Sequence, residues 1–175
     1  MRKFRDLLKT KDGLAAVEFA FIAPMMIAMF FGSVELCNAL LCQQKVTNIA
    51  STAADLVAQD AQISNTQITD VFSALNSIIY PYPSASAEII ITSLVDNGHG
   101  GGTVTWSSAQ NATAHSVGST MSVPTGVITS GGSVIYAEIT YTYTSSSTQL
   151  LHTPITMTDN FYARPRKGAQ VMKVS

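Results

Sequence analysis

Residues 14–34 read LAAVEFAFIAPMMIAMFFGSV, and this stretch decides the organisation of the chain. It contains one charged residue, Glu18, and as an α-helix it would be about 32 Å long, which is enough to cross the hydrocarbon core of a bilayer. A cleaved secretory signal has an apolar run of only about 7–15 residues that ends at a small-residue cleavage site. The run here is longer and no such site follows at a suitable distance. We therefore expect a transmembrane helix over residues 14–36.

The charges on the two sides of this stretch differ. Residues 1–13 carry five basic and two acidic residues, whereas residues 43–163 carry one basic residue, Lys45, against seven acidic residues. By the positive-inside rule, we expect residues 1–13 to be a cytoplasmic basic leader and the rest of the chain to lie outside. The net charge of the chain is −1, which gives no electrostatic support to nucleic-acid binding.

Glu18 needs an explanation, because a carboxylate inside the hydrocarbon costs about 2.5–3.5 kcal/mol and is usually paired or functional. One possibility is that it stays protonated or reaches toward the lipid headgroups. The other is that cleavage after Gly13 gives Leu14 a free α-ammonium group one helical turn from Glu18, or opposite it on a neighbouring copy. Only a neighbour docked with its amine at Glu18 would then avoid an unpaired buried charge, so the pair would set the register between subunits.

The stretch Lys11–Phe19, KDGLAAVEF, resembles the type IV prepilin processing site, in which a glycine after a short basic leader is followed by four residues, a glutamate and an aromatic. Its continuation to Pro24, with Gly32 and Glu35 near the end of the span, resembles the TadE-like pseudopilins of the tight-adherence (Flp) pilus assembly system. The resemblance is confined to the amino-terminal part of the chain.

This resemblance implies a processing site formed by Gly13, Leu14, Glu18 and Phe19, with cleavage by a prepilin peptidase between Gly13 and Leu14. It also implies a single-pass protein of the bacterial inner membrane with a cytoplasmic amino terminus and a periplasmic outer domain, incorporated in the pilus or supporting its assembly. The implied partners are the prepilin peptidase, other pilin-like subunits, the pilus assembly platform and the membrane.

Four residues of the span are candidates for packing between subunits: Glu18, Pro24, Ala28 and Gly32. Pro24 removes the backbone donor to the carbonyl of Ala20 and should kink or loosen the helix there. Ala28 and Gly32 form a small-x-x-x-small pair, which would let another helix approach closely.

Beyond the span, the sequence predicts an α+β fold, with a pilin-like plan implied by the resemblance. Apolar residues at helical spacing continue the first helix to about Gln59, and a second helix is expected over residues 66–78, so that residues 37–79 form a helical spine. Residues 80–175 are expected to form a β-rich domain, an antiparallel meander with its apolar face buried on the helices. Its expected strands are 87–95, 103–108, 133–144 and 155–163.

Two connections between these strands have a composition of their own. Asp96–Gly102 is expected to be a hairpin turn rather than a calcium loop, because it lacks the repeated acids and closing glutamate of such a loop. Residues 109–132 are polar and rich in Gly, Ser and Thr, so we expect a long mobile loop there, and loops of that length are often functional.

The sequence contains no motif that indicates catalysis or metal binding. His99, His115 and His152 are far apart and lack metal-site spacing, so surface histidines are expected. There is no phosphate-binding Gly-x4-Gly-Lys-Ser/Thr, no dinucleotide-binding Gly-x-Gly-x2-Gly and no Gly-x-Ser-x-Gly elbow. We therefore expect a protein that is not an enzyme, with no catalytic residue, metal, cofactor or small-molecule substrate. Cys37 and Cys42 would point about 140° apart on a helix, and we expect them to be small apolar residues rather than a disulfide.

Two alternatives remain open at this stage. The chain could be an unprocessed, single-pass membrane-anchored module whose β-rich domain recognises carbohydrate or protein. The carboxy-terminal basic residues could form a solvated tail, or they could contact the acidic groups of a partner or lipid headgroups. These residues are Arg164, Arg166, Lys167 and Lys173.

Overall fold

The computed structural model describes residues 14–145 and 153–174. The chain divides into two compact units, of which the described parts are residues 14–39 with Ser145, and residues 40–144 with 153–174. Helix α2 (Leu14–Ala58) passes from the first unit into the second, and every other described helix and strand belongs to the second unit.

Helix α2 confirms the long helix expected from the apolar run and its continuation, and it ends one residue before the predicted Gln59. Pro24 lies inside it without ending it. In the second unit, one face of α2 is buried at helical spacing, as the sequence pattern predicts. The buried residues of this face are Cys42, Val46, Ile49, Ala50, Ala53, Ala54, Val57 and Ala58.

Helix α3 (Asn65–Ile79) confirms the second predicted helix. It begins with a capping box, in which the Ser64 hydroxyl accepts a hydrogen bond from the Gln67 backbone N–H and the Gln67 side chain accepts one from the Ser64 backbone N–H. Its buried side chains, Ile68, Leu75 and Ile79, fall on one face. A single turn of 3-10 helix, η2 (Ser84–Ser86), leads into the sheet.

The main sheet has five antiparallel strands in the order β4-β3-β2-β5-β6. This confirms the α+β class and the four predicted strands. The strand order differs from the expected simple meander. In a meander β5 would pair with β3, the predicted strand before it, but β5 pairs with β2. The long connection between β3 and β5 contains β4, which pairs with the outer edge of β3. The chain then crosses to the other side of β2, where β5 pairs. The strands are β2 (Ala87–Asp96), β3 (Gly101–Gln110), β4 (Thr120–Ser122), β5 (Ser133–Tyr143) and β6 (Ile155–Ala163).

A second, two-stranded parallel sheet joins β1 (Gln62–Ser64) to β7 (Met172–Val174). The backbone N–H of Arg166 donates to the carbonyl of Ala58 at 2.8 Å, which satisfies an acceptor at the end of α2. The described carboxy-terminal segment is therefore fixed beside the junction between α2 and β1.

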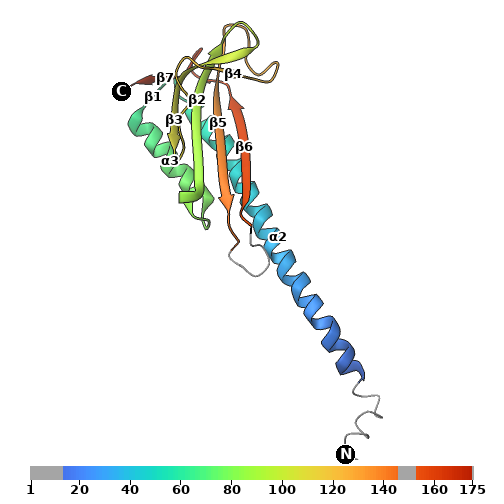
Figure 1. The fold of residues 1–175 in the computed structure, drawn as a ribbon. Coiled ribbons are helices and arrows are strands. Elements are labelled where there is room, and N and C mark those ends of the chain that lie inside the picture. The colour runs from blue at the N-terminus through green and yellow to red at the C-terminus, as the bar shows by residue number, and fades with distance from the viewer. Residues whose placement is uncertain (1–13, 146–152, 175) are drawn as a thin grey trace, which may run out of the picture. The chain divides into compact units, whose positions relative to one another are not determined.

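The inner face of the main sheet forms the core with α2 and α3. On β5, alternate residues from Ile135 to Tyr143 are all less than 5% exposed, and this alternation confirms the face predicted from the sequence. Figure 1 shows the carboxy-terminal part of α2 running along the sheet, where Thr47 donates a 2.5 Å hydrogen bond to Asp159 of β6.

The outer face of the sheet carries a second apolar cluster, which corrects the expectation of a mobile loop at residues 109–132. Part of this segment forms β4, and Val123, which follows β4, packs on Leu94, Val104, Val134 and Tyr136. The segment is rich in Gly, Ser and Thr, but its few apolar residues are spaced to reach the sheet, and burying them holds the segment in place. The expected Asp96–Gly102 hairpin turn is confirmed, because β2 and β3 pair on either side of it.

Candidate functional site

The amino-terminal part of α2 exposes its bulky apolar side chains on all sides. Between Val17 and Val34, their exposed fractions range from 43% at Val34 to 80% at Phe21. The helix is long and apolar enough to cross a membrane. Since each fully buried large apolar side chain contributes about 1.5–3 kcal/mol, such a surface is stable only against lipid or against other apolar helices.

The sequence-predicted packing candidates share one side of this helix. Pro24, Ala28 and Gly32 follow one another at four-residue spacing, which places them along one face of α2. Glu18 lies about 40° from Gly32 around the helix axis and about 21 Å from it along the axis. All four are exposed. On this side of the helix, the carboxylate of Glu18 therefore lies nearer the amino-terminal end, and the small residues Ala28 and Gly32 lie further along.

No contact among the described residues explains why position 32 is glycine. A Cβ atom built at Gly32 would meet nothing within 4 Å, and the backbone there is ordinary helix. Among the described residues, Glu18 forms no ion pair. Phe19, beside it, is 65% exposed.

The rest of the predicted processing site is described only in part. Leu14 is the first residue of α2 in the described range, and Glu18 follows it four positions later, about one turn along the helix. Gly13 and the basic leader of residues 1–13 lie outside the described residues.

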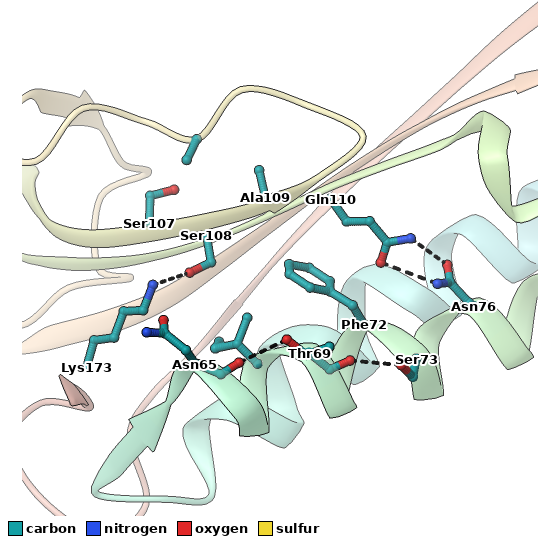
Figure 2. Close-up of a pocket in the computed structure, with 12 residues that line it drawn as sticks. Asn65, Thr69, Phe72, Ser73, Asn76, Ser107, Ser108, Ala109, Gln110 and Lys173 are labelled. Atoms are coloured by element: carbon teal, nitrogen blue, oxygen red, sulfur yellow. Dashed lines mark hydrogen bonds between the residues drawn. The ribbon is translucent and has the colours of Figure 1, made fainter. Parts of the chain in front are cut away.

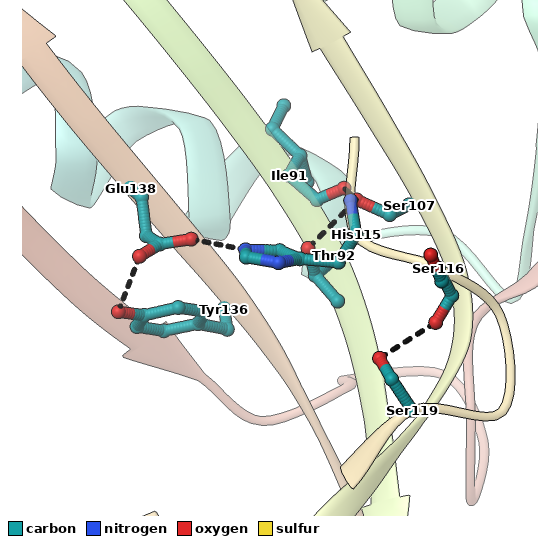
Figure 3. A network of polar contacts seen from close by, with 8 residues as sticks. All are labelled: Ile91, Thr92, Ser107, His115, Ser116, Ser119, Tyr136 and Glu138. Carbon is teal, nitrogen blue, oxygen red and sulfur yellow. Dashed lines mark hydrogen bonds and ion pairs between the residues drawn. The ribbon is translucent and has the colours of Figure 1, made fainter. Parts of the chain in front are cut away.

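A polar cluster on the outer face of the sheet was not predicted from the sequence. His115 Nε2 lies 2.5 Å from Glu138 Oε2, and the Tyr136 hydroxyl donates to Glu138 Oε1 at 3.0 Å (Figure 3). Tyr136 stacks on Tyr162 with ring centroids 4.5 Å apart. Burial, followed by the charge of Glu138, raises the pKa of the Tyr136 hydroxyl, so Tyr136 stays neutral and acts as a donor.

This cluster fastens the segment after β3 to the sheet. His115 lies in that segment, and its backbone N–H also donates to Ser107 of β3 at 3.2 Å. The sequence offered no signal for it, because 23 residues separate His115 from Glu138 and the pair fits no motif. Among the described residues, no group of three or more His, Cys, Asp and Glu side chains could hold a metal ion.

His99 is exposed and its ring contacts the backbone carbonyl of Asn97 in the hairpin turn, whereas His152 lies outside the described residues. Cys37 and Cys42 are both free thiols, as predicted, but Cys37 is exposed and only Cys42 is buried.

The carboxy-terminal basic residues contact groups of the chain itself. Arg166 forms an ion pair with Asp55, and Lys167 Nζ lies 3.3 Å from Asp60 Oδ1. The Arg164 guanidinium donates to backbone carbonyl groups of the segment after β4. These contacts lie within the chain itself, and the side chains of Arg166 and Lys167 remain 59% and 66% exposed.

The second unit also contains an open groove of about 610 Å³ between α3 and β3 (Figure 2). Phe72 and the paired amides of Asn76 and Gln110 line it, together with Lys173 from β7. The sequence gives no sign of this groove, because its walls come from three segments that are distant in the chain: α3, β3 with the residues after it, and β7.

The fold and the exposed helix define the class of the protein: a single apolar helix that fits a single-pass membrane protein, joined to an α+β domain. Residues 13–55, about a quarter of the chain, match the model of the TadE-like protein family. This confirms the resemblance found in the sequence, and the amino-terminal helix is TadE-like. The match extends beyond the predicted span into the part of α2 that packs in the second unit. No curated protein and no solved structure matches the chain.

The family match relates the candidate site to pilus assembly. A TadE-like protein is associated with the Tad pilus system, and this family suggests a role in assembly of that pilus. The family is not known as enzymatic. The matched region contains Gly13, Leu14 and Glu18 together with the small residues of the exposed face.

Proposed function

We propose that this protein is a pilin-like subunit that takes part in assembly of a Tad (Flp) pilus and has no enzymatic activity. Residues 1–13 serve as a cytoplasmic basic leader, residues 14–36 cross the bacterial inner membrane, and the rest of the chain lies in the periplasm. The unequal charge on the two sides of the span supports this orientation.

The observation that carries the proposal is the exposed apolar surface of α2 with one carboxylate on it. Lipid covers such a surface before assembly, and the equivalent helices of other pilin-like subunits cover it afterwards. Pro24, Ala28 and Gly32 let a neighbouring helix approach, since Gly32 has no packing role within the described chain.

Processing provides the partner of Glu18. A prepilin peptidase cleaves the bond between Gly13 and Leu14, and the new α-ammonium group at Leu14 pairs with Glu18, on the same subunit or on its neighbour. Where the pair joins two neighbouring subunits in a region of low dielectric constant, it discriminates strongly between registers, because any other register leaves both charges unpaired.

N-terminal sequencing and intact-mass measurement of the protein purified from its native membrane test this proposal. We expect the mature chain to begin at Leu14. Gly13→Ala should still be cleaved, whereas Gly13→Trp should retain the leader, because a bulky side chain would not fit where the peptidase accepts glycine.

The second candidate is the unprocessed membrane-anchored module, which the groove between α3 and β3 favours. If the functional wild-type protein keeps residues 1–13, the pilin-like proposal is wrong and the anchored module replaces it.

A further inference from the structure

The groove between α3 and β3 combines three features that no role in pilus assembly requires. They are a half-exposed aromatic ring, a pair of fixed amide side chains and one cation (Figure 2). The groove lies wholly within the second unit. Its volume of about 610 Å³ lies in the range of small-molecule sites, about 300–1,000 Å³.

Phe72 supplies the apolar surface of the groove. It follows the buried Ile68 by one turn of α3, but it is only partly buried, because its ring projects toward the end of β3. Ala109 and Ala114 line the same groove and have small side chains. An aromatic face bordered by small side chains stacks well on a flat ligand surface that bears C–H groups.

Asn76 and Gln110 supply fixed hydrogen-bonding groups. Asn76 Nδ2 donates to Gln110 Oε1 at 3.3 Å, and Gln110 Nε2 donates to Asn76 Oδ1 at 3.1 Å. Each amide carries two N–H donors and a carbonyl with two lone pairs, so the pair leaves a donor and an acceptor on each side chain for a ligand. Adjacent hydroxyl groups, which both donate and accept, match this arrangement.

Lys173 supplies the charge. Among the described residues that line the groove, Lys173 is the only ionisable one, and no carboxylate of these residues opposes it. Its Nζ donates to Ser108 Oγ at 2.9 Å, which fixes the ammonium group and leaves two of its three N–H donors for a ligand. A single cation matches a monovalent carboxylate better than a phosphate dianion, which usually recruits several cations or an arginine.

We propose that this groove binds an acidic saccharide, one that contains uronic acid. The apolar face of a sugar ring stacks on Phe72, its hydroxyl groups bond to Asn76 and Gln110, and its carboxylate pairs with Lys173. The proposal concerns the second unit alone and does not depend on cleavage after Gly13, so the two can fail separately.

Binding is measured with the full-length protein in detergent, by calorimetry, using oligomers of galacturonate, glucuronate and mannuronate and a neutral galactose oligomer of equal length. We expect at least one uronate oligomer to bind at submillimolar concentration, about fivefold more tightly than the neutral oligomer at low salt. This preference should disappear at 1 M salt, where screening acts over about 3 Å.

The variants separate the stacking contact of Phe72 from the charge contact of Lys173. Phe72→Leu should weaken binding of both kinds of oligomer about tenfold, and Lys173→Gln should remove only the preference for uronate, about fivefold. If Phe72→Leu unfolds the protein, Ala114→Trp, at an exposed position on the rim, should block the groove instead. Phe161→Leu and Lys167→Gln are matched controls outside the groove and should bind normally.

Three results would overturn the proposal. The first is that none of the uronate oligomers binds at millimolar concentration. The second is that the control variants lose as much affinity as the groove variants. The third is that a hexaglutamate peptide binds as tightly as the best uronate oligomer, which would show a general preference for anions.

Discussion

The indole nitrogen of Trp106 donates a hydrogen bond to the backbone carbonyl of Val171, 2.8 Å away and 65 residues later in the chain. Trp106 lies on β3, and both residues are buried. This bond fixes the segment before β7 to the main sheet. The small parallel sheet and the wall of the groove that contains Lys173 therefore depend on it.

Trp106→Phe tests this dependence. The substitution keeps an aromatic side chain but leaves the buried Val171 carbonyl without its donor, which typically costs about 1–3 kcal/mol. We expect that decrease in the free energy of unfolding, measured by urea denaturation and far-UV circular dichroism. Val117→Ala, at a position that is 72% exposed, should change it by less than about 0.5 kcal/mol. Equal urea midpoints for Trp106→Phe and wild type would contradict the structural role of the bond.

Buried tyrosines should make the protein sensitive to alkali. Burial raises the pKa of Tyr141 to about 12, and smaller contributions come from Cys42 and Tyr82. The unfolded chain loses the same proton near pH 10, so it binds fewer protons than the folded chain above that pH. The stability that Tyr141 contributes should be fully present below about pH 10 and lost as the pH rises toward 12.

The measurement is the urea midpoint as a function of pH between 8 and 12. Tyr141→Phe should reduce the slope without removing it, because the pKa of Tyr136 is also raised. Tyr80→Phe, at a side chain that is 76% exposed, should leave the slope unchanged. A wild-type profile that stays flat to pH 12 would contradict the burial of these hydroxyl groups.

Asp96 should make the hairpin region sensitive to acid. Its carboxylate accepts hydrogen bonds from the backbone N–H of Gly131 at 2.8 Å and of Gly98 at 3.0 Å, and these bonds, Gly131 first, lower its pKa. A lowered pKa contributes stability above the unfolded value of about 3.9, and this contribution is lost as the pH falls through the folded value. We expect the thermal midpoint of wild type to fall below about pH 4 more steeply than that of Asp96→Asn. Asp70→Asn, on the exposed face of α3, should behave as wild type.

The sequence predicted the elements whose signals are local. The apolar run predicted α2, the pattern over residues 66–78 predicted α3, and the strand expected over residues 133–144 is β5. In these cases, the residues that form the element also carry the pattern.

What the sequence did not predict depends on contacts between distant segments. β1 and β7 have three residues each, which is too short for a recognisable alternation, and their pairing joins segments about 110 residues apart in the chain. His115 and Glu138 meet only because the segment after β3 folds back on the sheet. The predicted pairing of β5 with β3 was wrong for the same reason. The pattern of a strand does not show which of two earlier strands it pairs with after a long connection.

Glu18 provides the sharpest test of the proposed assembly. We expect Glu18→Gln to spare cleavage after Gly13 more than assembly, since the scissile peptide bond and the two residues that form it are unchanged. Assembly should fall about 100-fold, because the Leu14 ammonium group would then lie unpaired in the membrane at a cost of about 2.5–3.5 kcal/mol. Glu18→Asp, which keeps the charge on a side chain one methylene shorter, should retain part of the assembly.

Leader cleavage is followed by electrophoretic mobility, and assembly by the amount of pilin in sheared pili. Phe31→Leu, at a 52% exposed position on the same helix, is the control for a general change in the span and should assemble normally. The essential comparison is between leader cleavage and assembly measured on the same variant. If Glu18→Gln and Glu18→Ala both assembled at the wild-type level, the carboxylate would not set the register, and the small residues of α2 would have to specify the packing by shape alone.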